Sequence, residues 1–143
     1  MKNIKLLVVL VLFLTLSCNN DKNLEKNLLG TWSNVSMKII FANDSIFKVE
    51  EGQWEEIFKM KPIKTTYYGD HRYVSEYRDL NDSLISRTLG RWSIKNDSLY
   101  LDSKGILTSF LFNYDHKIGE FTGIVDWNQD NIDELYYGVQ IKE

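Results

Sequence analysis

The stretch VDWNQDNIDELYYG, residues 125–138, places oxygen-bearing side chains at a spacing that suits calcium. Asp126, Asn128 and Asp130 occupy alternate positions, and Glu134 follows just before an apolar run. Calcium binds about six to eight oxygen ligands, and short acidic side chains on a curved loop direct several of them inward. The same residues also fit a metal-free hairpin turn, because Asn and Asp side chains accept hydrogen bonds from their own main chain. The sequence leaves both interpretations open.

The segment DWNQDNIDEL, residues 126–135, resembles the calcium loops of FG-GAP-type repeats, in which one strand leads directly into the next. It also shares the alternating ligands of an EF-hand loop, but Tyr137 stands where an EF-hand supplies its bidentate carboxylate. Asn131 and Glu134 replace the usual Gly and Asp of the FG-GAP-type loop. The resemblance implies a calcium ion of structural role, held by Asp126, Asn128, Asp130, the carbonyl group of Ile132, and Glu134.

The remaining sequence contains no recognisable catalytic arrangement. His71 and His116 lie in the polar segments YGDHRY and NYDHKI, which indicate turns, so both are expected at the surface. The glutamates of VEEGQWEE, residues 49–56, surround a predicted turn, where a solvated acidic face is expected rather than a catalytic carboxylate pair. The sequence has no nucleophile elbow, phosphate-binding glycine loop or Cys/His metal cluster. The protein is therefore predicted not to be an enzyme.

The N-terminal residues predict export from the cytoplasm. Lys2 and Lys5 precede an apolar run from Leu6 to Leu14, and small or apolar residues continue to Cys18. This run is too short to span a bilayer, which needs about 20 apolar residues, and it has the pattern of a secretory signal. We therefore predict a signal peptide over residues 1–17.

Cys18 is the only cysteine of the chain, so an intrachain disulfide is excluded. The segment LTLSC that it ends resembles the lipobox of bacterial lipoproteins. The resemblance implies that Cys18 is lipidated and becomes the new N-terminus, with residues 18–27 as its tether. Each buried CH₂ group of an acyl chain contributes about 0.8 kcal/mol to membrane binding. A lipid anchor in the bacterial cell envelope is implied, on the outer membrane or the cell surface; a buried free cysteine is the alternative.

The composition favours one small β-rich domain over residues 28–143. Aromatic residues make up 13% of the chain and proline occurs once. No long segment has the apolar periodicity of an amphipathic helix, and only a short helical turn is expected, at residues 24–29. The formal net charge is −3, and loss of the two lysines of the signal peptide makes the remainder more acidic. Such a charge argues against nucleic acid as a partner.

Turns recur along this domain at the spacing of short strands. The tripeptide Asn-Asp-Ser occurs at residues 43–45, 81–83 and 96–98, each time before an apolar-rich stretch. Asn and Asp favour hairpin turns, and alternating apolar residues between the turns indicate half-buried strands. The predicted strands lie near residues 31–41, 45–51, 54–60, 63–68, 71–78, 84–95, 98–102, 106–114, 118–126 and 134–142. This order predicts an antiparallel meander that forms a small β-barrel or a half-barrel.

Two segments of the domain resemble lipocalin-like proteins. LLGTWSNV resembles the entry into the first lipocalin strand, with Gly30 and Trp32 as its Gly-x-Trp motif. GRWSIKNDSLYL resembles the second Gly-x-Trp strand of lipocalin-like bacterial envelope lipoproteins, with Gly90 and Trp92. The resemblance implies a barrel with Trp32 plugging one end and a basic residue of the last strand, here Lys142, packing over its ring.

The same motif residues also have plain structural roles. Gly30 and Gly90 allow the backbone to bend at strand starts, and the two tryptophans bury large apolar areas. Further aromatic residues are expected to line the core or a cavity: Tyr67, Tyr68, Tyr73, Tyr77, Phe110 and Phe112.

The expected function is that of a membrane-anchored lipocalin-like lipoprotein without enzymatic activity, which binds a small apolar ligand or an envelope protein. The alternative is a β-rich adaptor or inhibitor with a filled core and an acidic surface, with or without a structural calcium site.

Overall fold

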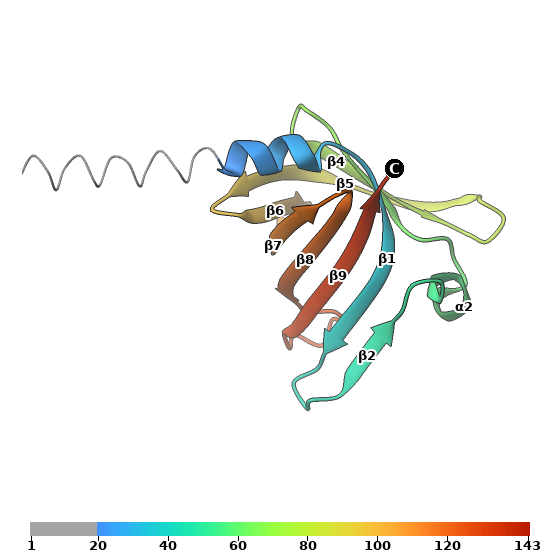
Figure 1. The fold of residues 1–143 in the computed structure, drawn as a ribbon. Coiled ribbons are helices and arrows are strands. Elements are labelled where there is room, and N and C mark those ends of the chain that lie inside the picture. Colours follow the sequence, from blue (N-terminus) through green and yellow to red (C-terminus); the bar gives the residue numbers. More distant parts are fainter. Residues whose placement is uncertain (1–19) are drawn as a thin grey trace, which may run out of the picture.

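A computed structural model describes residues 20–143 of the chain (Figure 1). The predicted signal peptide, residues 1–17, and the predicted lipidation site Cys18 lie outside the described residues. A helix over residues 20–28 precedes the first strand. The elements that follow are β1 (Gly30–Ile40), β2 (Ile46–Val49), α2 (Trp54–Phe58), β3 (Lys64–Tyr67), β4 (Arg72–Arg78), β5 (Leu84–Lys95), β6 (Ser98–Ser103), β7 (Ile106–Asp115), β8 (Ile118–Val125) and β9 (Glu134–Lys142).

Eight of these strands close into an antiparallel barrel. Neighbouring strands pair in chain order from β3 to β9, and β1 pairs with β3 on one edge and with β9 on the other. The pairing of β1 with β9 runs from Trp32 opposite Lys142 to Ile40 opposite Leu135. The prediction of an all-β meander is therefore confirmed, and the sheet is a closed barrel.

Strand β2 lies outside the eight-strand circuit. It pairs with the second half of β1, on the edge that β3 occupies along the first half. The chain then forms α2, so the predicted strand at residues 54–60 is wrong. Trp54 and Phe58 contact each other across one helical turn, with ring centroids 4.6 Å apart and planes tilted by 46°. In a strand these two residues would lie about 13 Å apart, so only the helix lets both rings enter the same apolar cluster.

The three Asn-Asp-Ser tripeptides all form turns, as predicted. Asp44, Asp82, Asn96 and Asp97 have positive φ angles of 62°, 66°, 51° and 61°. Asn and Asp adopt this left-handed conformation more readily than other residues with side chains. In the first turn, the Asn43 side chain also accepts a hydrogen bond from the main chain two residues on. The local sequence therefore decides where the chain reverses.

The helix over residues 20–28 closes one end of the barrel and is longer than the predicted turn at residues 24–29 (Figure 1). Asp21 fastens it to the turn between β5 and β6. Its two carboxylate oxygens accept hydrogen bonds from the main-chain N–H groups of Asn96 and Asp97, each at 3.0 Å. Most of the segment expected to be a tether is thus helical and contacts the barrel.

Trp32 lies at the centre of the main core, beneath this helix. It is fully buried, and its indole Nε1 donates a hydrogen bond of 2.7 Å to the carbonyl oxygen of Leu28. Phe112 and Phe121 meet the Trp32 ring edge-on, with centroids 6.1 and 6.3 Å away. Trp92 is buried in the same cluster. Both tryptophans therefore have the structural role that their motifs predict.

The two motif glycines differ in their function. Gly30 has a φ of +115° at the point where the helix passes into β1, which agrees with the predicted bend. Gly90 lies within β5, so the prediction that it stands at a strand start is wrong. A Cβ atom on Gly90 would collide with the carbonyl oxygen of Asp102 and lie 2.6 Å from the ring of Tyr73. Glycine is needed at this position for close packing.

Candidate binding site at the open end of the barrel

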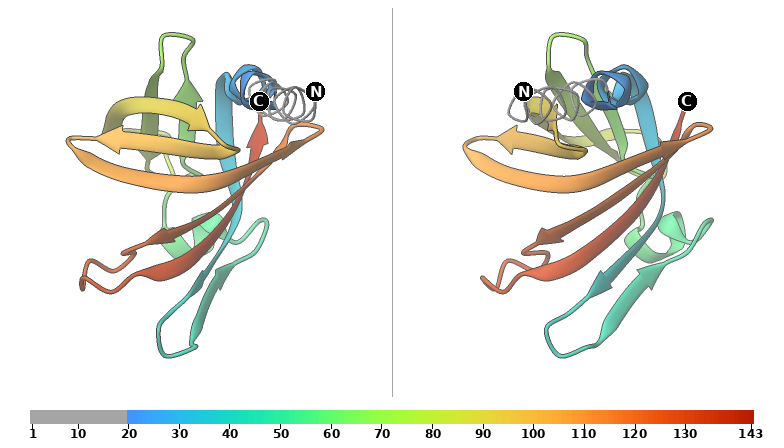
Figure 2. Two further views of the ribbon diagram at one scale, coloured as in Figure 1. Left: turned by 90° about the vertical axis from the view of Figure 1, so that its left-hand side faces the viewer. Right: turned by 60° about the vertical axis from the view of Figure 1, so that its left-hand side comes forward.

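The end of the barrel opposite the helix contains an open pocket of about 650 Å³. Figure 2 shows the turn between β1 and β2 and the loop between β8 and β9 at this end, away from the helix. The pocket lies among β4, β5, β6 and β7 and is lined by Tyr73, Arg87, Thr88, Leu89, Leu101, Ser103, Lys104, Ile106, Thr108 and Phe110.

Strand alternation explains why this part of the lumen is hollow. Thr88 stands on the same face of β5 as buried Trp92, and Thr108 stands on the same face of β7 as buried Phe112. The interior positions therefore carry large aromatic rings near the helix and small hydroxyl side chains toward the open end. Small side chains leave space unfilled, and the pocket occupies that space.

The chemistry of the pocket is mainly apolar. Leu101 and Phe110 are partly buried against the main core, and Tyr73 is buried within it. Burial raises the pKa of Tyr73, so its phenol stays protonated near neutral pH. Leu89 and Ile106 form an apolar rim and are 63% and 72% exposed. A molecule entering here would meet an apolar rim and then an apolar wall.

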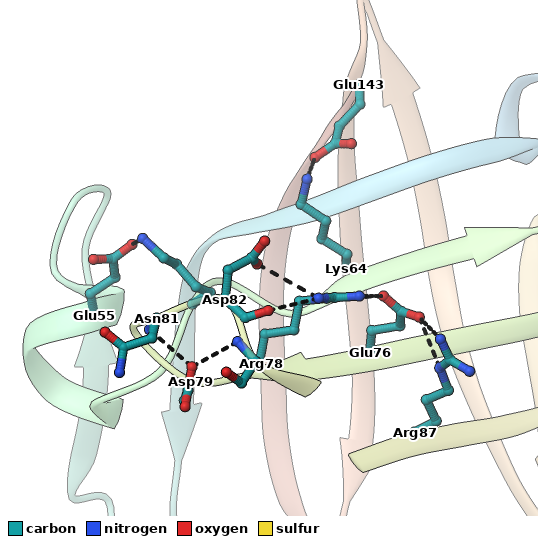
Figure 3. Close-up of polar contacts among 11 residues, drawn as sticks. Glu55, Lys64, Glu76, Arg78, Asp79, Asn81, Asp82, Arg87 and Glu143 are labelled. Carbon is teal, nitrogen blue, oxygen red and sulfur yellow. Dashed lines mark hydrogen bonds and ion pairs between the residues drawn. The ribbon is translucent and has the colours of Figure 1, made fainter. Parts of the chain in front are cut away.

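The charged residues that line the pocket are both basic, Arg87 and Lys104. Figure 3 shows how Arg87 is held: its Nη2 lies 2.7 Å from Oε1 of Glu76, and Arg78 Nη2 lies 3.0 Å from Oε2 of the same carboxylate. Hydrogen bonds lower the pKa of Glu76, with the larger contribution from Arg78 and a smaller one from Arg87. Lys104 forms no ion pair within the described residues. The rim of the pocket therefore combines apolar and basic side chains, on a protein whose formal net charge is negative.

The aromatic residues expected in the core or a cavity divide into three groups. Tyr67 and Phe112 are buried in the main core, whereas Tyr73 and Phe110 also line the pocket. Burial raises the pKa of Tyr67 far above its ordinary value. The expectation is wrong for Tyr68, which is 44% exposed because it follows the last residue of β3 and begins a turn. Tyr77 is half-buried.

The predicted calcium loop is a compact turn held by its own side chains. Asp126 accepts hydrogen bonds from the main-chain N–H groups of Asp130 and Asn131, both at 3.0 Å. Asn128 Oδ1 also accepts from the N–H of Asp130, at 3.2 Å. Asn131 and Gln129 have positive φ angles of 65° and 60°, which curl the loop around these groups. These side-chain oxygens thus have hydrogen-bond donors within the loop, as the metal-free hairpin interpretation expects.

The remaining predicted ligands of this loop are also engaged. Asp130 Oδ1 accepts a hydrogen bond from the N–H of Ile132 at 2.8 Å, and buried Glu134 accepts one from the N–H of Trp127 at 2.7 Å. Within residues 20–143 no group of three or more acidic, His or Cys side chains is placed to hold a metal ion. Calcium binding by Asp126, Asn128, Asp130, Ile132 and Glu134 stays a prediction.

His71 and His116 lie in turns, as expected. His71 packs beside Trp92 with ring centroids 4.8 Å apart, and His116 contacts the neighbouring Asp115 at the surface. Neither histidine lines the open pocket.

The chain matches no model of a known protein family, and no curated protein matches it. Its function is therefore inferred from its own residues and geometry. Among the described residues, no helix has both the length and the apolar character needed to cross a membrane.

The pocket residues Thr88, Ser103 and Thr108 and the basic residues Arg87 and Lys104 were not singled out by the sequence. A usable signal was present, because small hydroxyl residues follow the large apolar ones at interior positions of β5, β6 and β7. That pattern indicates a lumen that is filled at one end only.

Proposed function

We propose that this protein is a lipid-anchored, non-enzymatic barrel of the bacterial cell envelope that binds a small apolar molecule at its open end. The observation that carries the proposal is the pocket of about 650 Å³. Ligand pockets usually measure about 300–1,000 Å³ and combine apolar walls with a few polar groups. The lining of this pocket has that composition, with hydroxyl groups set among leucine, tyrosine and phenylalanine side chains.

The anchor in this proposal is Cys18. The described helix begins two residues later in the sequence, and two residues span at most about 7 Å. An acyl group on Cys18 would therefore hold the helical end of the barrel close to the membrane. The open end, on the far side of the barrel, would face away from it.

Photolabelling tests the ligand part of the proposal. The probe is an aliphatic diazirine of medium chain length, applied to the full chain in phospholipid nanodiscs, with labelled peptides identified by mass spectrometry. We expect labels on the interior residues of β6 and β7. Thr108→Phe should remove at least about nine-tenths of this label by filling the pocket. Ser109→Phe, on the outer face of the same strand, should keep it; equal labelling of both variants would overturn the proposal.

Metabolic labelling tests the anchor. Cells expressing the protein are fed an alkyne-bearing palmitate analogue, and the purified chain is assayed for the alkyne. We expect Cys18→Ala to lose the label and the neighbouring Ser17→Ala to retain it. Label on Cys18→Ala equal to that on the unmodified sequence would exclude Cys18 as the lipidation site.

A further inference from the structure

Strand β5 is paired along only part of one edge. It is 12 residues long, and residues 91–95 pair with β6. Residues 84–90 pair with β4 on the other edge, but no strand of the described chain pairs with them on the β6 side. The pocket lies beside this bare edge, because Arg87, Thr88 and Leu89 belong both to it and to the pocket lining.

The direction of the main-chain groups follows from the hydrogen bonds at either end of the edge. The N–H of Trp92 points toward the β4 side, where it donates to the carbonyl oxygen of His71 at 2.8 Å. The main-chain groups of successive residues in a strand point to alternate edges. The N–H and C=O groups of Leu89 and Arg87 therefore point to the β6 side. The hydroxyl group of Ser103 confirms this direction, since it donates to the Leu89 carbonyl oxygen at 3.0 Å.

Bare strand edges recognise extended peptide. A row of main-chain donors and acceptors is satisfied by another strand, and side chains of that strand alternate between the two faces of the sheet. Here one face of an added strand would meet the apolar pocket, and the other would lie beside exposed Leu89. The edge and the pocket thus fit the same extended segment.

The charge of this edge favours an acidic partner segment over other segments that could add to it. Arg87, Arg91 and Lys104 lie along it or beside it. The acidic groups near them are Glu76, which is shared between Arg78 and Arg87, and Asp102, which lies opposite Arg91 in the β5–β6 register. Antiparallel self-pairing centred at Arg87 would put two arginines opposite each other, which is unfavourable. An acidic segment from another protein would not meet this repulsion.

We propose that the bare edge of β5, centred on Arg87 and Leu89, binds an extended segment of another protein in which apolar residues alternate with acidic ones. The segment adds as a strand to β5 and places its apolar side chains in the pocket. This interaction goes beyond the binding of a small apolar molecule, because it depends on main-chain hydrogen bonds.

Fluorescence anisotropy with a defined peptide tests the proposal. The probe is a short fluorescein-labelled peptide, blocked at both ends, in which valine alternates with glutamate; the protein is the full chain in nanodiscs. We expect saturable binding that weakens at least about tenfold when the peptide is N-methylated on the bonds facing β5, because each methyl group removes a donor. Replacement of glutamate by lysine should weaken binding by a similar factor. Equal binding of the N-methylated peptide would overturn strand addition.

A pair of protein variants supplies the matched control. Leu89→Pro removes the main-chain N–H from the bare edge without touching the β4 ladder, whereas Leu89→Ala keeps the N–H and removes only the side chain. We expect Leu89→Pro to lose at least about tenfold more affinity than Leu89→Ala. Equal losses in the two variants would show that side chains alone hold the peptide, and would overturn the proposal.

Hydrogen exchange at single-residue resolution identifies the occupant directly. The peptide should slow exchange at the amides of Arg87 and Leu89. Slowed exchange at high protein concentration without peptide would show that a second copy of the chain covers the edge, and would overturn the proposal. Photolabelling by the aliphatic diazirine is read separately: its loss with peptide binding intact overturns small-ligand binding alone, and the reverse result overturns strand addition alone.

Discussion

The Nζ atom of Lys142 lies 5.6 Å from the centroid of the Trp32 ring. It also donates a hydrogen bond of 2.8 Å to the carbonyl oxygen of Asn27, so the last strand holds both the first strand and the closing helix. Partial burial lowers the pKa of Lys142, and the nearby charge of Lys117 lowers it further. One side chain thus connects the two ends of the barrel circuit.

Lys142→Met should test this connection, because methionine keeps much of the apolar stem and removes the ammonium group. We expect the free energy of unfolding to fall by about 1–2 kcal/mol, from the lost cation–π contact and the lost hydrogen bond. Urea unfolding followed by tryptophan fluorescence measures the change. Lys95→Met, at an exposed position of β5, is the control, and equal effects of the two substitutions would contradict the expectation.

Gly90→Ala should destabilise the barrel by about 1–3 kcal/mol, because the new methyl group meets the main chain of Asp102 and the ring of Tyr73. Gly69→Ala is the matched control, since a Cβ atom at Gly69 meets nothing within 4 Å. Thermal unfolding of the two variants compares them directly. A Gly69→Ala variant as unstable as Gly90→Ala would show that loss of glycine flexibility, rather than close packing, is the cause.

Asp21→Ala should loosen the closing helix from the turn between β5 and β6. The carboxylate accepts two main-chain hydrogen bonds there, and its loss should cost about 1–2 kcal/mol. We expect faster hydrogen exchange at the amides of Asn96 and Asp97. Exchange in Lys22→Ala should match that of the unmodified chain; if Asp21→Ala also matched it, the helix would not depend on this contact.

Glu76 should make the stability of the open end depend on pH. Arg78 and Arg87 lower its pKa below the ordinary value of 4.5 in the folded state. The carboxylate therefore stabilises the fold above about pH 4.5, and this contribution is lost as the pH falls through the folded pKa. Glu76→Gln should unfold at a lower temperature than the unmodified chain near neutral pH.

The difference between Glu76→Gln and the unmodified chain should shrink below about pH 4.5 and vanish in stronger acid. Differential scanning calorimetry across the pH range measures it. Glu56→Gln, on the exposed side of α2, should show little difference at any pH. A difference for Glu76→Gln that persists in strong acid would mean that packing, rather than charge, is responsible.

The acidic loop gives a prediction about calcium. In the metal-free interpretation its hydrogen bonds form between its own side chains and main chain, so chelation with EDTA would leave the unfolding temperature unchanged. Asp126→Ala should lower that temperature with or without calcium, because two main-chain donors lose their acceptor. Calorimetric titration with calcium provides the opposing result: saturable heat that disappears in Asp126→Ala would establish a calcium site.

Much of the fold was predictable from local sequence. The Asn-Asp-Ser turns lie where the chain reverses, and the alternating residues of the long strands set which side chains face the lumen. The residues of α2 were misread because Trp54 and Phe58 are compatible with either element when seen alone; only contact between their rings distinguishes them. Lys142 was identified by resemblance, and its contact with Trp32 agrees with that expectation.

The candidate site was less predictable, for a physical reason. The pocket opens where β5 extends beyond its pairing with β6, and how far two neighbouring strands overlap is not encoded by either strand alone. Arg87 and Lys104 become one basic rim only when the turn between β6 and β7 comes beside β5. Such a site depends on pairing between segments, which local patterns do not reveal.

The pairing of β1 with β9 has a consequence for how this chain folds. The two strands that must meet lie near opposite ends of the described chain. Bringing them together costs chain entropy before the contacts between β1 and β9 can stabilise the barrel. Barrel closure should therefore come late in folding. Until then, β1 keeps a free edge that another unfolded chain can occupy. Pairing of β9 with β1 therefore removes the edge on which a newly made molecule could aggregate.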